Sequence, residues 1–218
     1  MKAEIEVWFH YIADFENPVY TIYMNGVDEI FREKINTYKF VSDKVKRLTG
    51  RLMLQKAVEE SKIAINLTQN LSRNKYNKPF IKNGYEFNLS YSGQLVTLAF
   101  SKIAPLGIDV EHCKDFNYQS MLSQFNENEQ NYILQHPTPL EAFYHLWVKK
   151  ESLVKAEGIG LTDELNKLDC SGKSNNYFNK KWHFKRLNIK SDYICYLCSN
   201  FITDNIKISE IGIAKLIG

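Results

Sequence analysis

Cysteine, proline and glycine are scarce in this chain of 218 residues, which contains 4 cysteines, 5 prolines and 10 glycines. So few cysteines do not make the dense disulfide framework of a small secreted domain, and we expect the thiols to be reduced. Cys195 and Cys198 have the spacing of a zinc or redox pair, but no second such pair or paired histidine segment accompanies them in the sequence. Their odd spacing places the two thiols on opposite faces of a strand, so we interpret them as strand residues.

Long apolar segments and targeting signals are also missing. No run approaches the roughly 18 apolar residues that a membrane helix needs, and Lys2, Glu4 and Glu6 interrupt the apolar stretch that a signal peptide would require. The net charge is only +3 and no long basic run accompanies it, which argues against nucleic acid as a partner. We therefore expect a cytoplasmic protein with no membrane or nucleic-acid partner.

The hydrophobic content of 44% is sufficient for one sizeable core or for two small cores packed together. Periodicity and turn residues predict the order of the elements. In chain order, these are a strand at residues 4–9, a helix at 42–61 capped by Ser42, strands at 87–89, 95–100 and 106–110, helices at 118–135 and 140–157, and strands at 182–187, 193–199 and 206–213.

Helices and strands recur in a similar order in both parts of the chain. The sequence therefore predicts an α+β fold, a pseudo-dimer of two similar α+β halves, each a small mainly antiparallel sheet with packed helices. We assign residues 1–103 to the N-terminal half and residues 104–218 to the C-terminal half. The polar segment 170–181 is predicted to be a mobile loop.

Two carboxylates lie at the end of one predicted strand. In the segment GIDVE, strand alternation places Asp109 and Glu111 on one face and Ile108 and Val110 on the other. Neighbouring carboxylates raise one another's pKa unless a cation is present. Mg²⁺ takes oxygen ligands and binds through a few carboxylates together with substrate phosphates. Taken alone, such a pair is more typical of a solvated strand end.

The helix that follows residue 137 has clear end signals. Thr138 is suited to the N-cap, Pro139 to the first helical position, and Glu141 to the third position of a capping box. Gly158 provides a C-terminal stop.

One face of this helix carries Phe143, Trp147, Glu151 and Lys155, each four residues after the last. The spacing predicts an ion pair between Glu151 and Lys155, which on an exposed face would contribute little to stability. The two aromatic residues indicate instead that the face points inward, where a carboxylate needs a partner. One cation shared by Glu151 and the two strand carboxylates would satisfy all three.

Phosphate groups need positive partners, and the first half of the chain offers several. Lys34, Lys46, Arg47 and Lys78 are candidates, although each, taken alone, is more typical of a solvated surface. Gly50 lies inside the helix that carries Lys46 and Arg47. Close packing, close approach of a ligand or simple tolerance would each explain a glycine there.

Four blocks, NKP, FNLSYS, GIDVE and FYHLWVKKESLVK, resemble in this order the 4′-phosphopantetheinyl transferases of the surfactin-synthetase-activating type. The resemblance extends from about residue 34 to residue 161. It implies a pseudo-dimeric fold with coenzyme A bound between the halves. It also implies a holo-[acyl-carrier-protein] synthase activity, in which Mg²⁺-dependent transfer of 4′-phosphopantetheine to a serine of an apo acyl, polyketide or peptidyl carrier protein releases 3′,5′-ADP.

The same resemblance implies roles for individual residues. Asp109, Glu111 and Glu151 would be metal ligands, and Lys155 would contact the pyrophosphate region. Our mechanistic hypothesis adds that Glu151 accepts the serine proton, directly or through water, and that Lys155 offsets charge on the leaving phosphate. Glu129 matches an acidic position of the family. Contacts to coenzyme A would come from Lys34, Lys46, Arg47, Lys78, Ser90, Tyr91, Asp109 and Lys155.

One position departs from the family pattern. Tyr91 stands where the family usually has histidine, so a hydroxyl replaces a group that can carry charge, and the binding of coenzyme A is expected to differ. Two alternatives to the main interpretation are a non-catalytic module that binds carrier proteins and another Mg²⁺-dependent phosphate-ester enzyme.

The expected partners are coenzyme A and a carrier protein, bound by a monomer. Met121, Leu122 and Phe125 are candidates for carrier docking, and core packing is the alternative for these three residues.

Overall fold

The computed structural model describes residues 4–15, 23–62, 65–82, 86–160 and 165–217. In both halves of the chain a first strand is followed by helices and then by further strands. The first half comprises β1 (Ile5–Tyr11), α2 (Glu29–Asn36), α3 (Val41–Glu60), α4 (Leu67–Asn70), β2 (Leu71–Arg73), β3 (Pro79–Ile81), β4 (Glu86–Ser92) and β5 (Leu95–Ser101). The second part comprises β6 (Leu106–His112), the 3₁₀ helix η1 (Tyr118–Gln124), α5 (Glu127–Gln135), α6 (Pro139–Glu157), the 3₁₀ helix η2 (Leu165–Lys167), β7 (Ser174–Tyr177), β8 (Lys180–Arg186), β9 (Tyr193–Ser199), β10 (Ile206–Glu210) and α7 (Ile213–Ile217).

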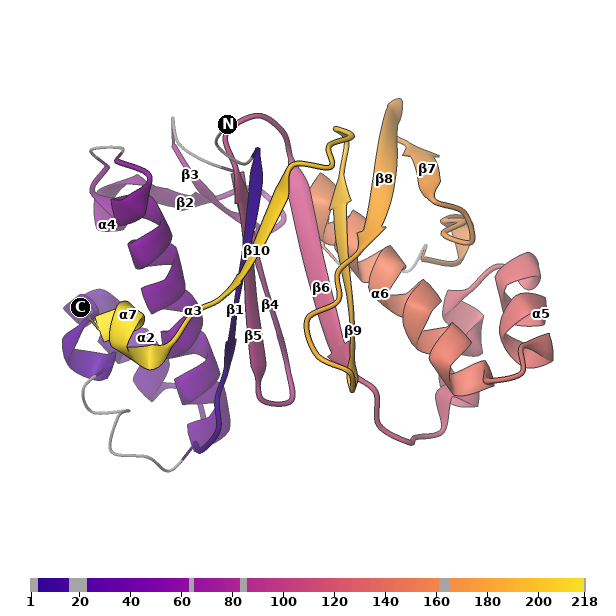
Figure 1. The fold of residues 1–218 in the computed structure, drawn as a ribbon, viewed down its shortest axis with the longest axis horizontal. Helices are drawn as coiled ribbons and strands as arrows, with labels where there is room; N and C mark the ends of the chain where they lie inside the picture. The colour runs from indigo at the N-terminus through magenta and orange to yellow at the C-terminus, as the bar shows by residue number, and fades with distance from the viewer. Residues whose placement is uncertain (1–3, 16–22, 63–64, 83–85, 161–164, 218) are drawn as a thin grey trace.

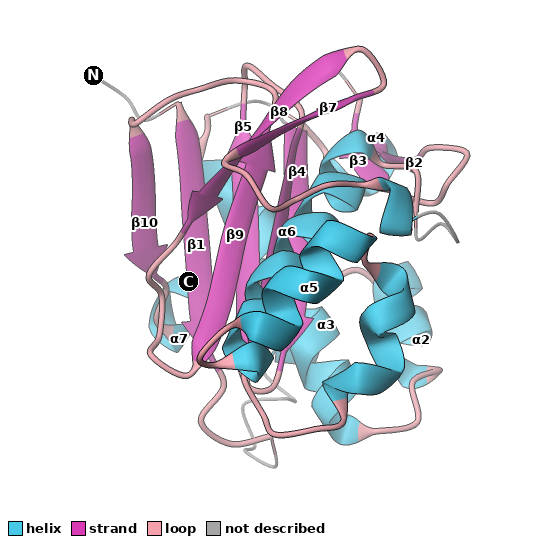
Figure 2. Ribbon diagram, turned by 90° about the vertical axis from the view of Figure 1, so that its right-hand side faces the viewer, coloured by secondary structure: helices cyan, strands magenta, loops and turns pink. Residues whose placement is uncertain are grey.

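Two four-stranded sheets form the centre of the molecule. The first has the strand order β10-β1-β5-β4 and is antiparallel except for the β1–β10 pair, and the second has the antiparallel order β6-β9-β8-β7. Helix α3 covers the outer face of the first sheet, and α6 covers that of the second (Figure 1). Viewed from the second half, α5 and α6 lie in front of this second sheet (Figure 2). The predicted α+β pseudo-dimer is confirmed.

Apolar side chains fill the space between each pair of layers. Strand β1 shows how the alternation works: Ile5, Val7 and Phe9 pack between the two sheets, while Trp8 points the other way and packs beneath α3. Both faces of this strand are therefore buried, whereas the sequence predicted one. The inter-sheet core is continuous across the two halves, so the halves are not free to separate without exposing apolar surface.

The last strand joins the first sheet. The sequence predicts a strand at residues 206–213 as part of the second half, but β10 pairs in parallel with β1, and Ile211 and Leu216 lie in the core beneath α3. The prediction of its sheet partner is wrong because strand periodicity does not indicate which sheet a strand joins. The division of the chain at residue 103 stays a prediction.

Several local predictions need correction. Helix α3 begins at Val41 after Phe40, and no side chain caps it, so Ser42 is not its cap. The single helix expected at residues 118–135 is divided into η1 and α5, because Asn126 caps a new helix there. Part of the expected mobile loop at residues 170–181 is strand β7, which pairs with β8.

The cysteines behave as predicted. All four are free; Cys195 packs between the sheets and Cys198 packs on the opposite face of β9 beneath α6. Burial raises the pKa of both thiols well above the ordinary value.

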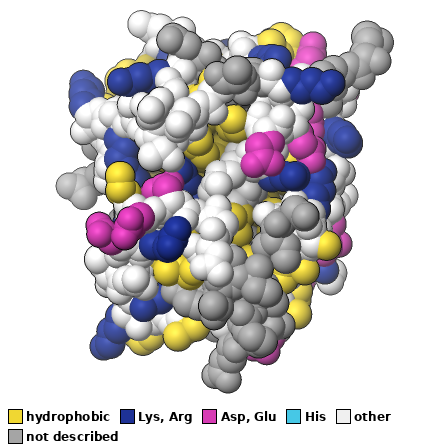
Figure 3. Space-filling model, turned by 90° about the vertical axis from the view of Figure 1, so that its left-hand side faces the viewer, with side chains coloured by type: hydrophobic (Ala, Val, Ile, Leu, Met, Phe, Trp, Pro, Cys, Tyr) yellow, Lys and Arg dark blue, Asp and Glu magenta, His cyan; other side chains and the backbone are white. Residues whose placement is uncertain are grey.

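Neither sign of charge dominates the coloured part of the face shown in Figure 3. Figure 3 views the side of the molecule that carries α2, α3 and α7, and its basic and acidic side chains are interspersed among the residues drawn in colour. Within the described ranges, no helix has the length and apolar character that a membrane crossing requires.

Candidate active site

The two strand carboxylates project from β6 as predicted. Ile108 and Val110 are fully buried between the sheets, and Asp109 and Glu111 emerge on the other face of the strand, toward α6. Asp109 is only 2% exposed. A charged group at that depth requires partners, which come from both halves of the molecule.

Helix α6 approaches β6 closely because of Gly107. A Cβ atom at this position would lie 2.2 Å from the carbonyl oxygen of Ser152 and 2.3 Å from the backbone nitrogen of Ala156. Any side chain would therefore displace the helix. The contact brings the part of α6 that carries Glu151 and Lys155 against the strand that carries the acidic pair.

The ends of α6 agree in part with the sequence signals. Pro139 lies in the first turn, and Gly158 is the C-cap in the left-handed region, with φ of 75°. Thr138 occupies the N-cap, but its side chain accepts no hydrogen bond from the backbone of the first turn. Its hydroxyl donates instead to the carboxylate of Glu141 at 3.1 Å. The predicted capping box is thus absent here, while Asn126 and Glu129 form one at the start of α5.

Lys155 contacts Asp109 and not the carboxylate that the spacing predicted. Its Nζ lies 2.5 Å from Asp109 Oδ1 and donates to Ser90 Oγ at 3.0 Å. The Ser90 hydroxyl in turn donates to Asp109 Oδ1 at 2.8 Å. The predicted ion pair between Glu151 and Lys155 is therefore wrong: β6 offers a deeper and closer carboxylate than the next turn of the helix.

The remaining carboxylate oxygens are short of partners. Asp109 Oδ2 and Glu151 Oε1 are buried with no hydrogen-bond partner, and Glu111 accepts one bond from Ser92 Oγ at 2.6 Å. Burial, together with the negative charge of Asp109, raises the pKa of Glu151 to about 7 and also raises the pKa of Glu111. Three carboxylates therefore share one small region with a single ammonium among them.

This donor set fits a hard divalent cation. As the described side chains stand, no group of three His, Cys, Asp or Glu residues is arranged to hold a metal, and the ammonium of Lys155 lies against Asp109. Two buried oxygens without partners are nevertheless what an oxygen-liganded cation would satisfy.

A groove of about 350 Å³ opens beside these carboxylates at the junction of the two halves. The first half contributes Tyr76, Asn77, Lys78, Pro79 and Asn88 to its walls. The second half contributes Glu151, Val154, Lys155, Gly158 and Gly160.

Lys78 lines this groove, but its charge is directed at the end of α6. Its Nζ donates to the carbonyl oxygens of Ala156 at 2.9 Å and Leu106 at 3.3 Å, and burial lowers its pKa. Asn74 donates to the carbonyl oxygen of Gly158 at 2.8 Å. The loop before β3 thus satisfies the last carbonyls of the helix that carries Glu151.

A second cavity, of about 220 Å³, lies within the first half and shares Pro79 and Asn88 with the groove. Lys34, Arg47 and Arg73 line it. Burial lowers the pKa of Lys34, and the charges of Arg73 and Arg47 lower it further. A cluster of cations without an acidic partner inside the cavity is suited to an anionic ligand.

The structure separates the two adjacent basic residues of α3. Arg47 lines the cavity, whereas Lys46 pairs with Asp43 at 3.1 Å and is not among the lining residues. Arg73 was missed by sequence reasoning; an additional arginine in the turn-rich segment before NKP was the available signal.

Tyr91 stands between Arg47 and Gly50. The guanidinium of Arg47 lies 4.3 Å from the centre of the tyrosine ring, and a Cβ atom at Gly50 would lie 2.4 Å from the tyrosine hydroxyl oxygen. Close packing is therefore the reason for the helix glycine. Burial raises the pKa of Tyr91 to about 12, so this side chain is neutral at physiological pH.

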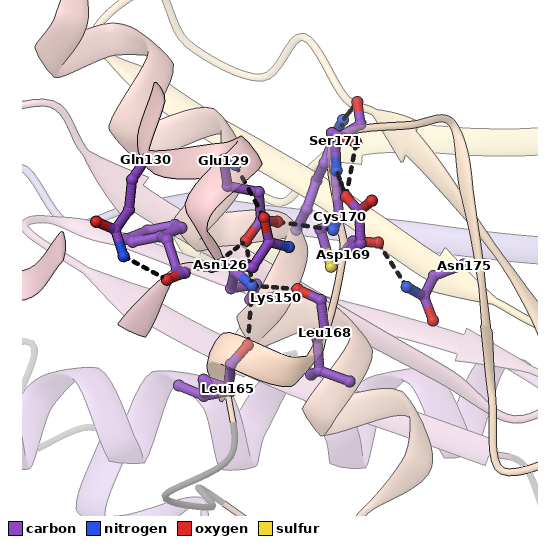
Figure 4. Close-up of polar contacts among 12 residues, drawn as sticks. Asn126, Glu129, Gln130, Lys150, Leu165, Leu168, Asp169, Cys170, Ser171 and Asn175 are labelled. Atoms are coloured by element: carbon purple, nitrogen blue, oxygen red, sulfur yellow. Dashed lines mark hydrogen bonds and ion pairs between the residues drawn. The ribbon is translucent and has the colours of Figure 1, made fainter. Parts of the chain in front are cut away.

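Glu129 lies outside the carboxylate cluster, in a buried pair with Lys150 (Figure 4). Its Oε2 is 2.7 Å from Lys150 Nζ, both side chains are fully buried, and its Oε1 accepts from the backbone of Cys170 at 2.8 Å. Lys150 also donates to the carbonyl oxygens of Leu165 and Leu168. These contacts fix α6 to its neighbours.

Of the three candidate docking residues, Phe125 is in the core. It is 1% exposed and packs edge-on against Phe143, with ring centres 5.4 Å apart. Met121 and Leu122 are partly buried against the same cluster.

Both halves of the chain match models of one protein family. A family model described as the 4′-phosphopantetheinyl transferase superfamily matches residues 105–198. A second model, described as 4′-phosphopantetheinyl transferase, N-terminal, matches residues 16–103. The two models adjoin each other and together span most of the chain.

Curated relatives agree with the family models. The 4′-phosphopantetheinyl transferase gsp of Aneurinibacillus migulanus is 27% identical over 155 residues, which are 70% of this chain and 65% of the relative. The 4′-phosphopantetheinyl transferase Sfp of Bacillus subtilis is 29% identical over 144 residues, 64% of each chain. The human L-aminoadipate-semialdehyde dehydrogenase-phosphopantetheinyl transferase is 30% identical over 159 residues, 63% of this chain and 50% of the relative.

The matched part of this chain spans less than two thirds of the length of these relatives. The two family models nevertheless account for both halves of the fold, one for each. The chain therefore belongs to the 4′-phosphopantetheinyl transferase superfamily.

Proposed function

We propose that this protein transfers the 4′-phosphopantetheine group of coenzyme A to a serine of an apo carrier protein and releases 3′,5′-ADP. The observation that carries the proposal is the meeting of Asp109, Glu111, Glu151 and Lys155 beside a groove between the two halves. Membership of the family and the names of its relatives support the same activity.

The groove and the cationic cavity together would hold coenzyme A. Pro79 and Asn88 line both, so the two lie next to each other, as an extended ligand that occupies both would require. Lys34, Arg47 and Arg73 would bind phosphate on the nucleotide side, where charge-assisted hydrogen bonds are strong. The neutral Tyr91 can donate a hydrogen bond there but adds no charge.

Asp109, Glu111 and Glu151 would hold Mg²⁺ in this proposal. Bound there, the ion would neutralise charge on the phosphates of coenzyme A. The two buried oxygens without partners, Asp109 Oδ2 and Glu151 Oε1, support this assignment.

Glu151 is our candidate for the base that accepts the proton of the carrier serine. A raised pKa of about 7 is close to the optimum for a general base at neutral pH, and Glu151 lines the groove. Lys155, which already bonds Asp109 and Ser90, would stabilise the negative charge that develops on the leaving phosphate.

The carrier would be an acyl, polyketide or peptidyl carrier protein, including those of nonribosomal peptide synthesis, and the enzyme would act as a cytoplasmic monomer. The pairing of two complete sheets within one chain supports the monomer.

The test is incubation with coenzyme A, Mg²⁺ and a panel of apo carriers, read by intact mass. We expect one or more carriers to gain the mass of phosphopantetheine. Glu151→Gln should slow the gain about 100-fold or more, while Glu141→Gln, an exposed carboxylate on the same helix, should leave it unchanged.

Three outcomes would contradict the proposal. The first is no mass gain on any carrier, with or without Tyr91→His. The second is release of 3′,5′-ADP without a carrier, which would indicate a phosphohydrolase. The third is stoichiometric carrier binding without mass gain, which would indicate a non-catalytic module.

A further inference from the structure

Side chains of one strand join the two halves at their meeting edges. Strands β4 and β6 are the edges of different sheets, and three alternate residues of β4 bridge them. Each accepts a hydrogen bond from the backbone N–H group 20 residues later: Asn88 Oδ1 from Ile108 at 2.9 Å, Ser90 Oγ from Val110 at 3.3 Å, and Ser92 Oγ from His112 at 3.0 Å. The constant offset means that the two strands run parallel along this seam.

The two serines of the seam have a second contact that Asn88 lacks. Ser90 donates to Asp109 at 2.8 Å, and Ser92 donates to Glu111 at 2.6 Å. A hydroxyl can accept from the backbone and donate to a carboxylate at the same time. Strand β4 of the first half therefore holds both the backbone edge of β6 and the side chains of Asp109 and Glu111, which β6 carries.

The carboxylates bonded by Ser90 and Ser92 differ in their other partners. The carboxylate of Asp109 also forms an ion pair with Lys155. Of the residues that the structure describes, only Ser92 donates a hydrogen bond to the carboxylate of Glu111. Glu111 is the longer and less buried of the two acids, so its orientation depends more on this single bond.

We propose that Ser92 is a positioning residue that holds the Glu111 carboxylate in the orientation needed to bind the divalent cation, an inference that rests on the proposed function. Glutamate loses rotational freedom when it becomes a ligand. A hydroxyl that already holds the glutamate carboxylate in place reduces this loss. Mutation of a residue that bonds a metal ligand commonly lowers metal affinity 10- to 100-fold.

The experiment compares Ser92→Ala, Ser92→Thr and Asn88→Ala. Titration calorimetry with Mn²⁺ gives the dissociation constant, thermal unfolding in EDTA gives stability, and the Mg²⁺ concentration for half-maximal transfer is measured on the full chain with carrier and coenzyme A. Ser92→Ala should weaken Mn²⁺ binding about tenfold and raise the half-maximal Mg²⁺ concentration by a similar factor. The transfer rate at saturating Mg²⁺ should change little.

The other two variants separate orientation of Glu111 from loosening of the seam. Ser92→Thr keeps the hydroxyl and should restore metal affinity to within about twofold of the parent protein. Asn88→Ala also leaves a β6 N–H group without its acceptor, so it should lower the melting temperature, but it touches no carboxylate and should leave Mn²⁺ affinity unchanged.

Each remaining result would count against the inference. Unchanged Mn²⁺ affinity in Ser92→Ala would overturn it while leaving the proposed function intact. Equal loss in Asn88→Ala would assign the effect to the seam as a whole. A parent protein that binds no Mn²⁺ would overturn the inference together with the metal site of the proposed function, whatever the transfer assay shows.

Discussion

At the scale of single residues, the properties of Glu151 come from its neighbours. Burial and the adjacent charge of Asp109 raise its pKa to about 7, and one of its oxygens has no partner. The same carboxylate on a solvated helix would be ionised at neutral pH and would contribute little. Its placement makes it responsive to pH.

In the metal-free protein, Glu151 should therefore destabilise the fold as pH rises. Below about pH 4.5, its ordinary pKa, the folded and unfolded states are both protonated and it contributes nothing. Between pH 4.5 and 7 the unfolded state ionises first, so the free energy of unfolding falls with rising pH. Glutamine at position 151 does not ionise, so the Glu151→Gln variant should not lose stability in this way. In EDTA, its free energy of unfolding relative to that of the parent protein should rise between pH 4.5 and 7, by at most about 3 kcal/mol. Urea denaturation at several pH values measures it, and a difference that stays constant with pH would contradict it.

The contact between Gly50 and Tyr91 is a second residue-scale determinant. Alanine is the better helix former by about 1 kcal/mol, but a methyl group at position 50 would overlap the tyrosine ring. Gly50→Ala should therefore destabilise the protein by about 1–3 kcal/mol through overpacking.

A double-mutant cycle with Tyr91→His tests this explanation. The smaller ring should relieve the overlap, so that Gly50→Ala is neutral or stabilises by up to about 1 kcal/mol in the histidine background. Denaturant unfolding of the four proteins gives the coupling energy, and additive effects would show that the two residues do not interact.

At the scale of elements, contacts from several neighbouring segments hold α6 in position. Gly107 lets it lie against β6, and Lys78 and Asn74 bond its last carbonyls. Lys149 donates to the carbonyl oxygens of residues 170 and 172 at 3.1 and 3.0 Å. The helix that carries Glu151 is thus anchored by both halves.

The buried pair of Glu129 and Lys150 is the anchor whose loss should matter most. Glu129→Ala would leave the Lys150 ammonium buried without its carboxylate, which should destabilise the protein by about 3–5 kcal/mol. Combining Glu129→Gln with Lys150→Met removes both charges and should restore part of that loss.

The exposed pair of Lys56 and Glu59, 3.2 Å apart on α3, provides the control. Glu59→Gln should change the free energy of unfolding by less than about 1 kcal/mol. If guanidinium denaturation gave similar changes for Glu129→Ala and Glu59→Gln, the buried pair would not be a principal anchor of α6.

At the scale of the whole molecule, the C-terminal segment couples the two halves because it packs against the first half. Strand β10 follows the second sheet in sequence but pairs with β1, and Ile211 lies 2% exposed in the core of the first half. Together with the shared core between the sheets, this connection predicts one cooperative unfolding transition.

Ile211→Ala tests the coupling. We expect the free energy of unfolding to fall by about 2–5 kcal/mol. The melting temperature should also fall, and unfolding should still occur in a single transition. Ile208→Ala, on the neighbouring strand but 40% exposed, should have a much smaller effect. Two separate transitions in calorimetry would show that the halves unfold independently.

The sequence by itself was sufficient for the alternation of elements, the two-half architecture and the carboxylates of the candidate site. Periods of two and 3.6 residues are local properties, so GIDVE and the stripe ending at Lys155 could be placed on a strand and a helix before their contacts were known. The site assignments among the cations and for the metal remain predictions.

Only the tertiary structure decided which of these residues meet. It paired Lys155 with Asp109 rather than with Glu151, turned Lys78 toward the end of α6, brought Arg73 to the cationic cavity and moved β10 into the first sheet. Each of these contacts joins segments that are far apart in the chain or chooses between competing partners. Local periodicity carries no information on that choice, because it is made by packing and burial across the two halves.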